Sequence, residues 1–289
     1  MEGDSDGSTI KHIYITRVDK MQVAVPPVEE QIKFLLVIKS IDDRINLLRE
    51  TNQTLEAIVQ ALFKSWFVDF DPVRAKAEGR VPDGIDVETA ALFPDKFDED
   101  ETGLVPTGWE VKNFLEFIER QPVGKKFDQK TALTKGVVPI LDQGKSGIIG
   151  FHNESAGVKA SLENPVVVFA NHTCYMRLIC FDFSAIQNVL PFTGKQVDTI
   201  WAYYATKDRI KFSEYKGHWP DFAIEKAVVP PEILTKLYKE AVSPLVNRIQ
   251  FNELQANTLS NLRDTLLPRL ISGQLRIADA KTELEKTIA

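Results

Sequence analysis

The sequence predicts an α+β protein in which one globular α/β domain is inserted between two long helices that pair as a coiled coil. Residues 26–70 and 227–270 each carry apolar residues at alternating spacings of three and four, the pattern of one long helix packing along another. The segment between them contains short runs rich in valine and isoleucine, bounded by glycine, asparagine and proline, and these predict strands. At about 1.5 Å per residue such a helix measures roughly 60 Å, so we expect it to extend beyond a small globular domain.

The first long helix is predicted over residues 26–70. Pro26 and Pro27 mark its start, because proline is tolerated in the first helical turn, and Pro72 marks its end. Asn52 has two interpretations that the sequence leaves open: a polar residue of the seam that fixes the register, or a side chain facing solvent at the edge of the pair. The seam positions are Ile38, Ile41, Ile45, Leu48, Asn52, Leu55, Val59, Leu62 and Trp66.

Residues 71–107 are predicted to form an acidic linker with proline and glycine turns and short helices at 73–79 and 87–92. From residue 69 to 101 there are 4 Lys and Arg against 11 Asp and Glu, 4 − 11 = −7, so this stretch accounts for the net charge of −6 of the whole chain. Residues 108–228 hold 15 Lys and Arg against 13 Asp and Glu, 15 − 13 = +2. This mildly basic balance permits DNA binding there but does not demonstrate it.

The globular domain is predicted at residues 108–228. One helix is expected at 199–206, where apolar residues recur at spacings of three and four. The expected strands are 109–111, 137–141, 148–151, 165–169 and 176–181.

The second long helix is predicted over residues 229–272 and repeats the first. Pro230 lies 230 − 26 = 204 residues after Pro26, and the same offset relates Leu55 to Leu259. Arg263 interrupts the seam, where Leu262 could substitute; residues 273–289 are predicted to be a charged tail. The seam continues as Val242, Leu245, Ile249, Asn252, Ala256, Leu259, Leu266 and Leu270. The residues assigned to helix pairing are Ile41, Ile45, Leu48, Leu55, Leu62, Leu245, Ile249, Leu259 and Leu266.

Composition excludes several classes of protein. Cys174 and Cys180 are too few for a disulfide framework and lie in no metal-ligand pattern, so we expect reduced thiols and no metal site. There is no apolar run long enough to span a membrane, and the acidic N-terminus lacks the apolar core of a signal peptide. The prediction is a cytoplasmic protein with no membrane partner.

No catalytic constellation is present in the sequence. Gly144-Lys145-Ser146 lacks the earlier glycine of a phosphate-binding loop, because Pro139 stands in its place. The four histidines show no ligand spacing, and there is no glycine-rich loop for S-adenosylmethionine. We therefore predict no catalysis and no cofactor on this chain.

Five loops of the domain instead carry the groups that read DNA. Lysine and arginine contact phosphates, and amides and hydroxyls contact base edges. Each loop taken alone is equally well interpreted as ordinary solvated surface. The candidate DNA-binding residues are Lys125 and Lys126; Gln143, Lys145 and Ser146; Asn171, His172, Thr173, Tyr175 and Arg177; Lys195 and Gln196; and Lys216 and His218.

Four motifs beside the helices are distinctive in combination. Val25-Pro26-Pro27 is followed by Glu30-Gln31, and residues 55–73 read LEAIVQALFKSWFVDFDPV. Pro106-Thr107-Gly108-Trp109 opens the domain, and residues 267–273, LPRLISG, close the second helix. Together they resemble the specificity subunit of type I restriction-modification systems, over nearly the whole chain and least in the domain.

The resemblance implies that the domain is a target recognition domain, which reads half of a split site in double-stranded DNA. It also implies that the long helices are antiparallel and fix the spacing between the halves. Methyltransferase subunits would dock on the helices, bringing S-adenosylmethionine and the methyl transfer, and a restriction subunit could join. Off-seam aromatic residues, namely Phe63, Phe67 and Phe70, are candidates for that docking, with ordinary packing an equal alternative.

The chain departs from the family in having one recognition domain, with residues 1–25 as the expected remnant of another. We therefore expect a half-size subunit that self-associates, since two-fold pairing would restore two recognition domains. Two alternatives remain open: an interaction module that dimerises or titrates methyltransferase subunits without reading DNA, and an inert fragment.

Overall fold

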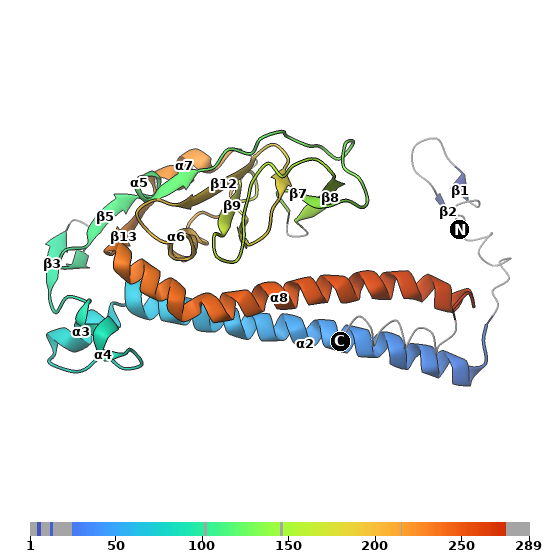
Figure 1. Ribbon diagram of the computed structural model, residues 1–289, viewed down its shortest axis with the longest axis horizontal. Coiled ribbons are helices and arrows are strands. Elements are labelled where there is room, and N and C mark those ends of the chain that lie inside the picture. Colours follow the sequence, from blue (N-terminus) through green and yellow to red (C-terminus); the bar gives the residue numbers. More distant parts are fainter. Residues whose placement is uncertain are drawn as a thin grey trace. The chain divides into compact units, whose positions relative to one another are not determined.

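A computed structural model describes residues 5–6, 12–13, 25–100, 103–144, 147–214 and 216–275. The chain divides into two compact units, Met1–Glu50 with Asn252–Ala289, and Thr51–Phe251. Two 40-residue helices, α2 (Val28–Phe67) and α8 (Glu232–Ile271), contribute to both units (Figure 1). Most of the predicted remnant at 1–25 and of the tail at 273–289 lies outside the described residues; within the remnant, β1 (Ser5–Asp6) pairs antiparallel with β2 (His12–Ile13).

In the first unit the ends of the two helices share an apolar seam. Arg263, which interrupts the predicted seam, donates to Asp42 at 2.8 Å, and Leu262 packs half-buried against the cluster in its place. The buried members are Ile41, Ile45 and Leu48 from α2, and Ala256, Leu259, Leu266 and Leu270 from α8, joined by Leu275.

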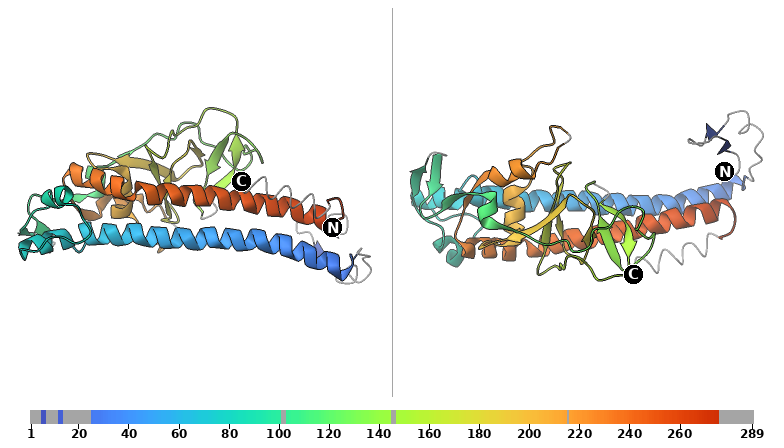
Figure 2. Two further views of the ribbon diagram at one scale, coloured as in Figure 1. Left: turned by 60° about the horizontal axis from the view of Figure 1, so that its bottom comes forward. Right: turned by 90° about the horizontal axis from the view of Figure 1, so that it is seen from above.

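In the second unit the helices run antiparallel. The Asn52 amide donates to the Ile249 carbonyl at 3.0 Å, and the Tyr238 hydroxyl donates to the Val59 carbonyl at 3.0 Å, so rising numbers in α2 meet falling numbers in α8. The views of Figure 2 agree that the helices lie side by side along these segments. Asn52 therefore bonds across the helix pair, as the interpretation of a polar seam residue that fixes the register requires. Leu55, Leu62 and Leu245 are half-buried.

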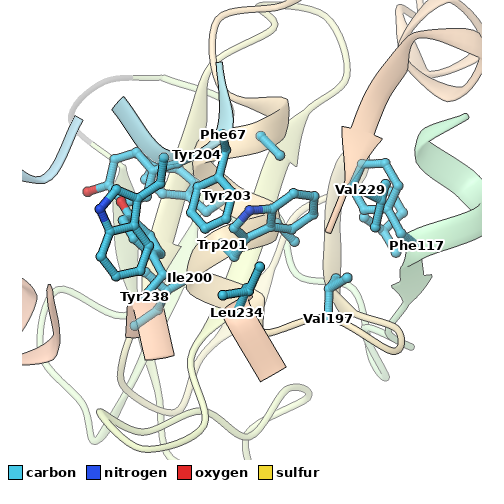
Figure 3. Packing of buried hydrophobic residues seen from close by; sticks show 14 of the residues in the cluster. Phe67, Phe117, Val197, Ile200, Trp201, Tyr203, Tyr204, Val229, Leu234 and Tyr238 are labelled. Carbon is cyan, nitrogen blue, oxygen red and sulfur yellow. The ribbon is translucent and has the colours of Figure 1, made fainter. Parts of the chain in front are cut away.

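The same segments of α2 and α8 also form part of the core of the globular domain. Phe67, Trp201 and Tyr238 lie together in this core (Figure 3). The ring of Phe67 lies 6.0 Å from that of Trp201 and 5.5 Å from that of Tyr238, and the ring of Phe63 lies 5.8 Å from that of Tyr238. Phe67 is 4% exposed and Phe70 7%. Of the two alternatives for these residues, ordinary packing therefore holds for Phe67 and Phe70, and Phe63 packs partly buried against the same cluster.

The acidic segment 71–107 packs against this core. It contains α3 (Asp71–Ala77), α4 (Val87–Ala91) and a hairpin of β3 (Phe97–Asp100) and β4 (Gly103–Pro106). Phe93 is 1% exposed and its ring lies 5.4 Å from that of Trp66. Lys76 donates to the Ala90 carbonyl at 3.0 Å, which ties α3 to α4. The acidic segment thus contributes Val73, Phe93 and Val105 to the buried core.

In its described residues the globular domain contains three small sheets, and the α+β class is confirmed. A four-stranded antiparallel sheet has the order β10 (Met176–Ile179), β9 (Val166–Ala170), β12 (Val189–Gly194), β6 (Ile118–Arg120). A three-stranded sheet has the order β11 (Ser184–Ala185), β7 (Val138–Leu141), β8 (Ile148–His152). The pair β13 (Lys226–Val229) and β5 (Glu110–Asn113) and the helices α5 (Phe114–Phe117), α6 (Thr199–Thr206) and α7 (Trp219–Ile224) complete it.

The register of the four-stranded sheet gives it two distinct ends. Val189 pairs with Ala170 and Phe192 with Val167, so residues 171 and 188 meet at one end and residues 165 and 194 at the other. At the second end α6 begins, and the Asp198 backbone N–H donates to the Thr235 hydroxyl of α8 at 2.9 Å. The helix α8 therefore contacts one end of this sheet.

A polar contact joins α6 to α2 beside the aromatic core. Glu56 forms an ion pair with Lys207 and accepts a hydrogen bond from the Tyr204 hydroxyl at 2.8 Å. Burial acts to raise the pKa of Glu56, but hydrogen bonding and the charge of Lys207 outweigh it and lower the pKa below its ordinary value. Burial, with the charge of Glu56, raises the pKa of Tyr204, so its hydroxyl stays protonated and donates.

This contact predicts a specific acid dependence of stability. The pKa of Glu56 is lower in the folded state than in the unfolded state. The carboxylate therefore stabilises the fold fully at pH values above its unfolded pKa, and this stabilisation is lost as the pH falls through its folded pKa. Glu56→Gln should cost on the order of 1–3 kcal/mol at neutral pH and flatten the acid limb of the unfolding free energy. Urea unfolding between about pH 7 and about pH 3 measures this, with exposed Glu99→Gln as the control; parallel acid limbs for Glu56→Gln and the parent would contradict it.

The position of Phe67 gives a second prediction. Phe67→Ala should destabilise the protein by about 3–5 kcal/mol, because it removes a buried ring from the shared core. Its neighbour Val68 is 54% exposed, so Val68→Ala should stay within about 0.5 kcal/mol of the parent. Equal effects in a urea titration would show that the helix and the domain do not share this core.

Candidate nucleic-acid interface

Two of the predicted DNA-binding loops meet at the free end of the four-stranded sheet. The His172 backbone N–H donates to the Gln143 side-chain Oε1 at 3.0 Å, and the Thr173 hydroxyl donates to the Gln143 carbonyl at 2.6 Å. One loop follows β7 and the other follows β9, so residues 29 or 30 positions apart are held together. These bonds give the Gln143 amide a defined orientation, since only its oxygen can accept from an N–H.

A third predicted loop joins the same end through Asn171. Asn171 accepts hydrogen bonds from the backbone N–H of His218 at 2.8 Å and from that of Trp219, also at 2.8 Å, the second through its side-chain Oδ1. His172 Nδ1 lies 2.9 Å from the Lys216 carbonyl and must donate to it, which places a proton on that nitrogen. Asn171 therefore positions two loops, and its own side-chain oxygen is already used.

A hollow of about 620 Å³ opens beside the Gln143 loop. Its floor is apolar, with Phe127, Ile149 and Ile186, and its rim is polar, with Lys126, Asp128, Gln129, Thr131, Asp142, Gln143, Thr173 and Gln187. Among the described groups none accepts a hydrogen bond from Gln143 Nε2, and Lys126 and Thr173 are exposed. Donors and acceptors on a rigid rim around an apolar floor suit the edge of a planar polar ligand.

Arg177 holds the loop after β7 in place. Its guanidinium donates to the Gly147 carbonyl at 3.1 Å, and the Asp142 N–H donates to the same carbonyl at 3.2 Å. Gly147 has φ +77, and a Cβ there would lie 1.6 Å from an Arg177 nitrogen. Arg177 thus acts as a positioning residue for this loop. Lys145 and Ser146, which lie between these residues in sequence, are outside the described residues.

The remaining predicted residues divide between the site and other places. Lys125 forms an ion pair with Glu154. Tyr175 is half-buried in the turn that follows Thr173. His218 is 1% exposed and its ring lies 3.1 Å from the Glu214 carbonyl, so the expectation of a surface histidine at this position is corrected.

Lys195 and Gln196 lie at the opposite end of the four-stranded sheet. They follow β12 at Gly194, which pairs with Ile118, and the Lys195 N–H donates to the Phe117 carbonyl at 2.8 Å. Four of the five candidate loops thus meet at one end of the sheet or border it, and the loop at 195–196 does not.

Sequence reasoning missed two amides of the hollow, Gln129 and Gln187. Gln187 follows the two-residue strand β11, which is too short to leave a period in the sequence. Gln129 lies three residues beyond Lys126, and extending the basic loop by one turn would have included it. In the described part of the chain no cluster of His, Cys, Asp or Glu has the arrangement of a metal site. Within the same residues, every helix is too short or too polar to cross a bilayer.

The predicted role of Arg177 can be tested by hydrogen exchange. Arg177→Ala removes a hydrogen bond from a charged donor, worth about 1.5–3 kcal/mol, so the Asp142 N–H should exchange at least about tenfold faster. The exposed Arg80→Ala variant serves as the control. Unchanged exchange at Asp142 in the Arg177 variant would show that the loop holds its conformation without this side chain.

Comparison with known proteins places this geometry among related chains. No family model matches. The type I restriction enzyme HindI specificity subunit of Haemophilus influenzae is 27% identical over 345 residues, covering 95% of this chain and 73% of that protein. The MjaIX specificity subunit of Methanocaldococcus jannaschii is 23% identical over 300 residues, covering 95% of this chain and 65% of that protein.

A solved structure shares the fold. The S subunit of a type I restriction-modification system from M. genitalium matches with a TM-score of 0.53 and 14% identity, over 93% of this chain and 68% of that one. At this identity the likeness concerns the fold alone.

Proposed function

We propose that this chain, a relative of type I restriction-enzyme specificity subunits, reads one half of a bipartite site in double-stranded DNA and carries no catalysis of its own. The observation that supports this most is the Gln143 amide, which is oriented by His172 N–H beside an open hollow. A surface that reads sequence needs such fixed donors and acceptors on a rigid scaffold.

The chemistry of this end of the sheet fits base edges in a major groove. A glutamine that presents Nε2–H as a donor and retains a lone pair on Oε1 matches the N7 and N6 groups of adenine. Thr173 and Gln187 extend the polar rim, and Ile149 and Ile186 offer apolar contact to a thymine methyl group. Lys126, which is exposed, is the proposed phosphate contact.

The long helices are proposed to carry the partners. Exposed apolar residues cluster on the first-unit segment of α2, where Leu35 is 67% and Leu36 62% exposed, together with Val28 and Ile32. This surface replaces the buried phenylalanines as the proposed docking site for methyltransferase subunits, which would bring S-adenosylmethionine, and a restriction subunit is a further proposed partner. The proposed location of the assembly is the cytoplasm.

A second copy of the chain is our proposed source of the other half-site reader. Two-fold pairing gives two identical readers in opposite orientation, so the target would be a split palindrome. Sedimentation velocity with the methyltransferase present should show two copies of this chain per complex. A single copy in every complex would contradict the pairing while leaving DNA reading by this domain untouched.

Selection from a random DNA pool tests the proposed function. The protein with its methyltransferase should enrich one bipartite motif, and Gln143→Glu should change the preferred base at one position, because it keeps the acceptor for His172 N–H but replaces the donor with an acceptor suited to cytosine N4. Lys126→Ala should weaken all sequences alike and reduce the salt slope by about 0.9. Formation of the complex without any enriched motif would contradict DNA reading.

A further inference from the structure

The pair β5–β13 has one open edge beside an apolar surface. Phe114 N–H donates to the Glu225 carbonyl at 2.9 Å, and the register pairs Ala227 with Lys112, so residues 225, 227 and 229 face β5. Residues 226 and 228 therefore direct their backbone groups away from β5. Arg209 donates to the Lys226 carbonyl at 2.8 Å, as this alternation requires.

Val228 is the open position of this edge. Its N–H and C=O face outward, and no described group bonds to either. Figure 1 shows β13 beside β5, and in the described part of the chain β13 pairs with that strand alone. An edge with free backbone groups is a template for another extended segment.

Two hollows border the same three residues, Lys226, Ala227 and Val228. One has about 280 Å³ and is lined by the rings of Phe63, Phe67 and Trp201 together with Leu104. The other has about 400 Å³ and is lined by Val111 and Ile224. Two hollows beside one strand edge suit an extended segment, whose alternate side chains point to opposite sides.

Exposed apolar side chains surround the two hollows. Val68 is 54% exposed, Leu104 53% and Ile224 72%, and all three line these hollows. Arg209 and Lys226 border both hollows. Arg209 forms an ion pair with Glu225 at 3.5 Å, while Lys226 is exposed and in no ion pair among the described residues. The unbalanced charge at the edge is positive.

We propose that the β13 edge binds an extended segment of a partner protein, with alternating apolar side chains and an acidic residue, which pairs with Val228 as an added strand. Backbone bonding at Val228 selects an extended segment over a helix, and Lys226 selects the acidic residue. A second copy of β13 fits poorly, because antiparallel pairing centred on Val228 would set Lys226 of one copy opposite Pro230 of the other, which has no N–H to donate. Pro230 and Pro231 end the strand, so the contact is short and an affinity on the order of 10 μM is expected.

Selection of displayed random dodecapeptides on the immobilised full-length chain tests this inference, which does not depend on DNA reading. Enriched peptides should alternate apolar and polar residues, carry Asp or Glu, and slow hydrogen exchange at residues 226–229. Val228→Pro should weaken their binding at least about tenfold, because it removes the outward N–H and leaves the bonds to β5 in place. Val68→Ser and Leu104→Ser should weaken it as well, while Val81→Pro, at an exposed loop position, should not.

Four results would overturn the proposal. The first is an absence of enriched peptides. The second is enrichment of amphipathic helical peptides. The third is equal binding to Val228→Pro and to the parent when both variants unfold at the same temperature. Pairing of two copies through β13, seen as dimers abolished by Val228→Pro, would also overturn it.

Discussion

The structure depends on one shared core, in which aromatic side chains of the long helices and of the globular domain pack together. Phe67 from α2, Trp201 from α6 and Tyr238 from α8 are each at most 4% exposed, and their rings are in contact. Because none of these surfaces is buried without the other two, the domain is positioned by the same contacts that pair the helices in this unit. The ion pair of Glu56 with Lys207 fixes the C-terminal end of α6 against α2.

The two ends of the four-stranded sheet have different surroundings. At one end of the sheet Asp198 is bonded to α8, and at the other end, near residues 171 and 188, three of the candidate loops meet. There the loops are fixed to one another by backbone bonds through Gln143 and Asn171. Some polar groups that the sequence offers as DNA contacts, such as Asn171 Oδ1, are thus used in hydrogen bonds within the protein. Among the described residues Gln143 Nε2 is not used in this way, and its position is set by the hydrogen bond to Gln143 Oε1.

The sequence predicted what is periodic and local. The long helices and α6, found at the predicted residues 199–206, have apolar spacing that packing alone explains. It missed β12, whose Pro191 argues against a strand, and β13, which precedes two prolines. It left docking and ordinary packing as equal alternatives for Phe63, Phe67 and Phe70, because nothing near them in the sequence reveals that Trp201 and Trp109 pack against them. Lys195 and Gln143 both lie in short loops that contain glycine and lysine. Only the strand register shows that these loops lie at opposite ends of the four-stranded sheet.

Native-state hydrogen exchange measures the central claim most directly. If the core is shared, amides of α6, of α2 near Val59 and of α8 near Tyr238 should exchange through one opening with a common free energy, and Trp201→Ala should lower that free energy equally at all three places. The contradicting result is faster exchange in α6 of the Trp201 variant with unchanged protection in α2 and α8. The globular domain and the long helices would then have separate cores.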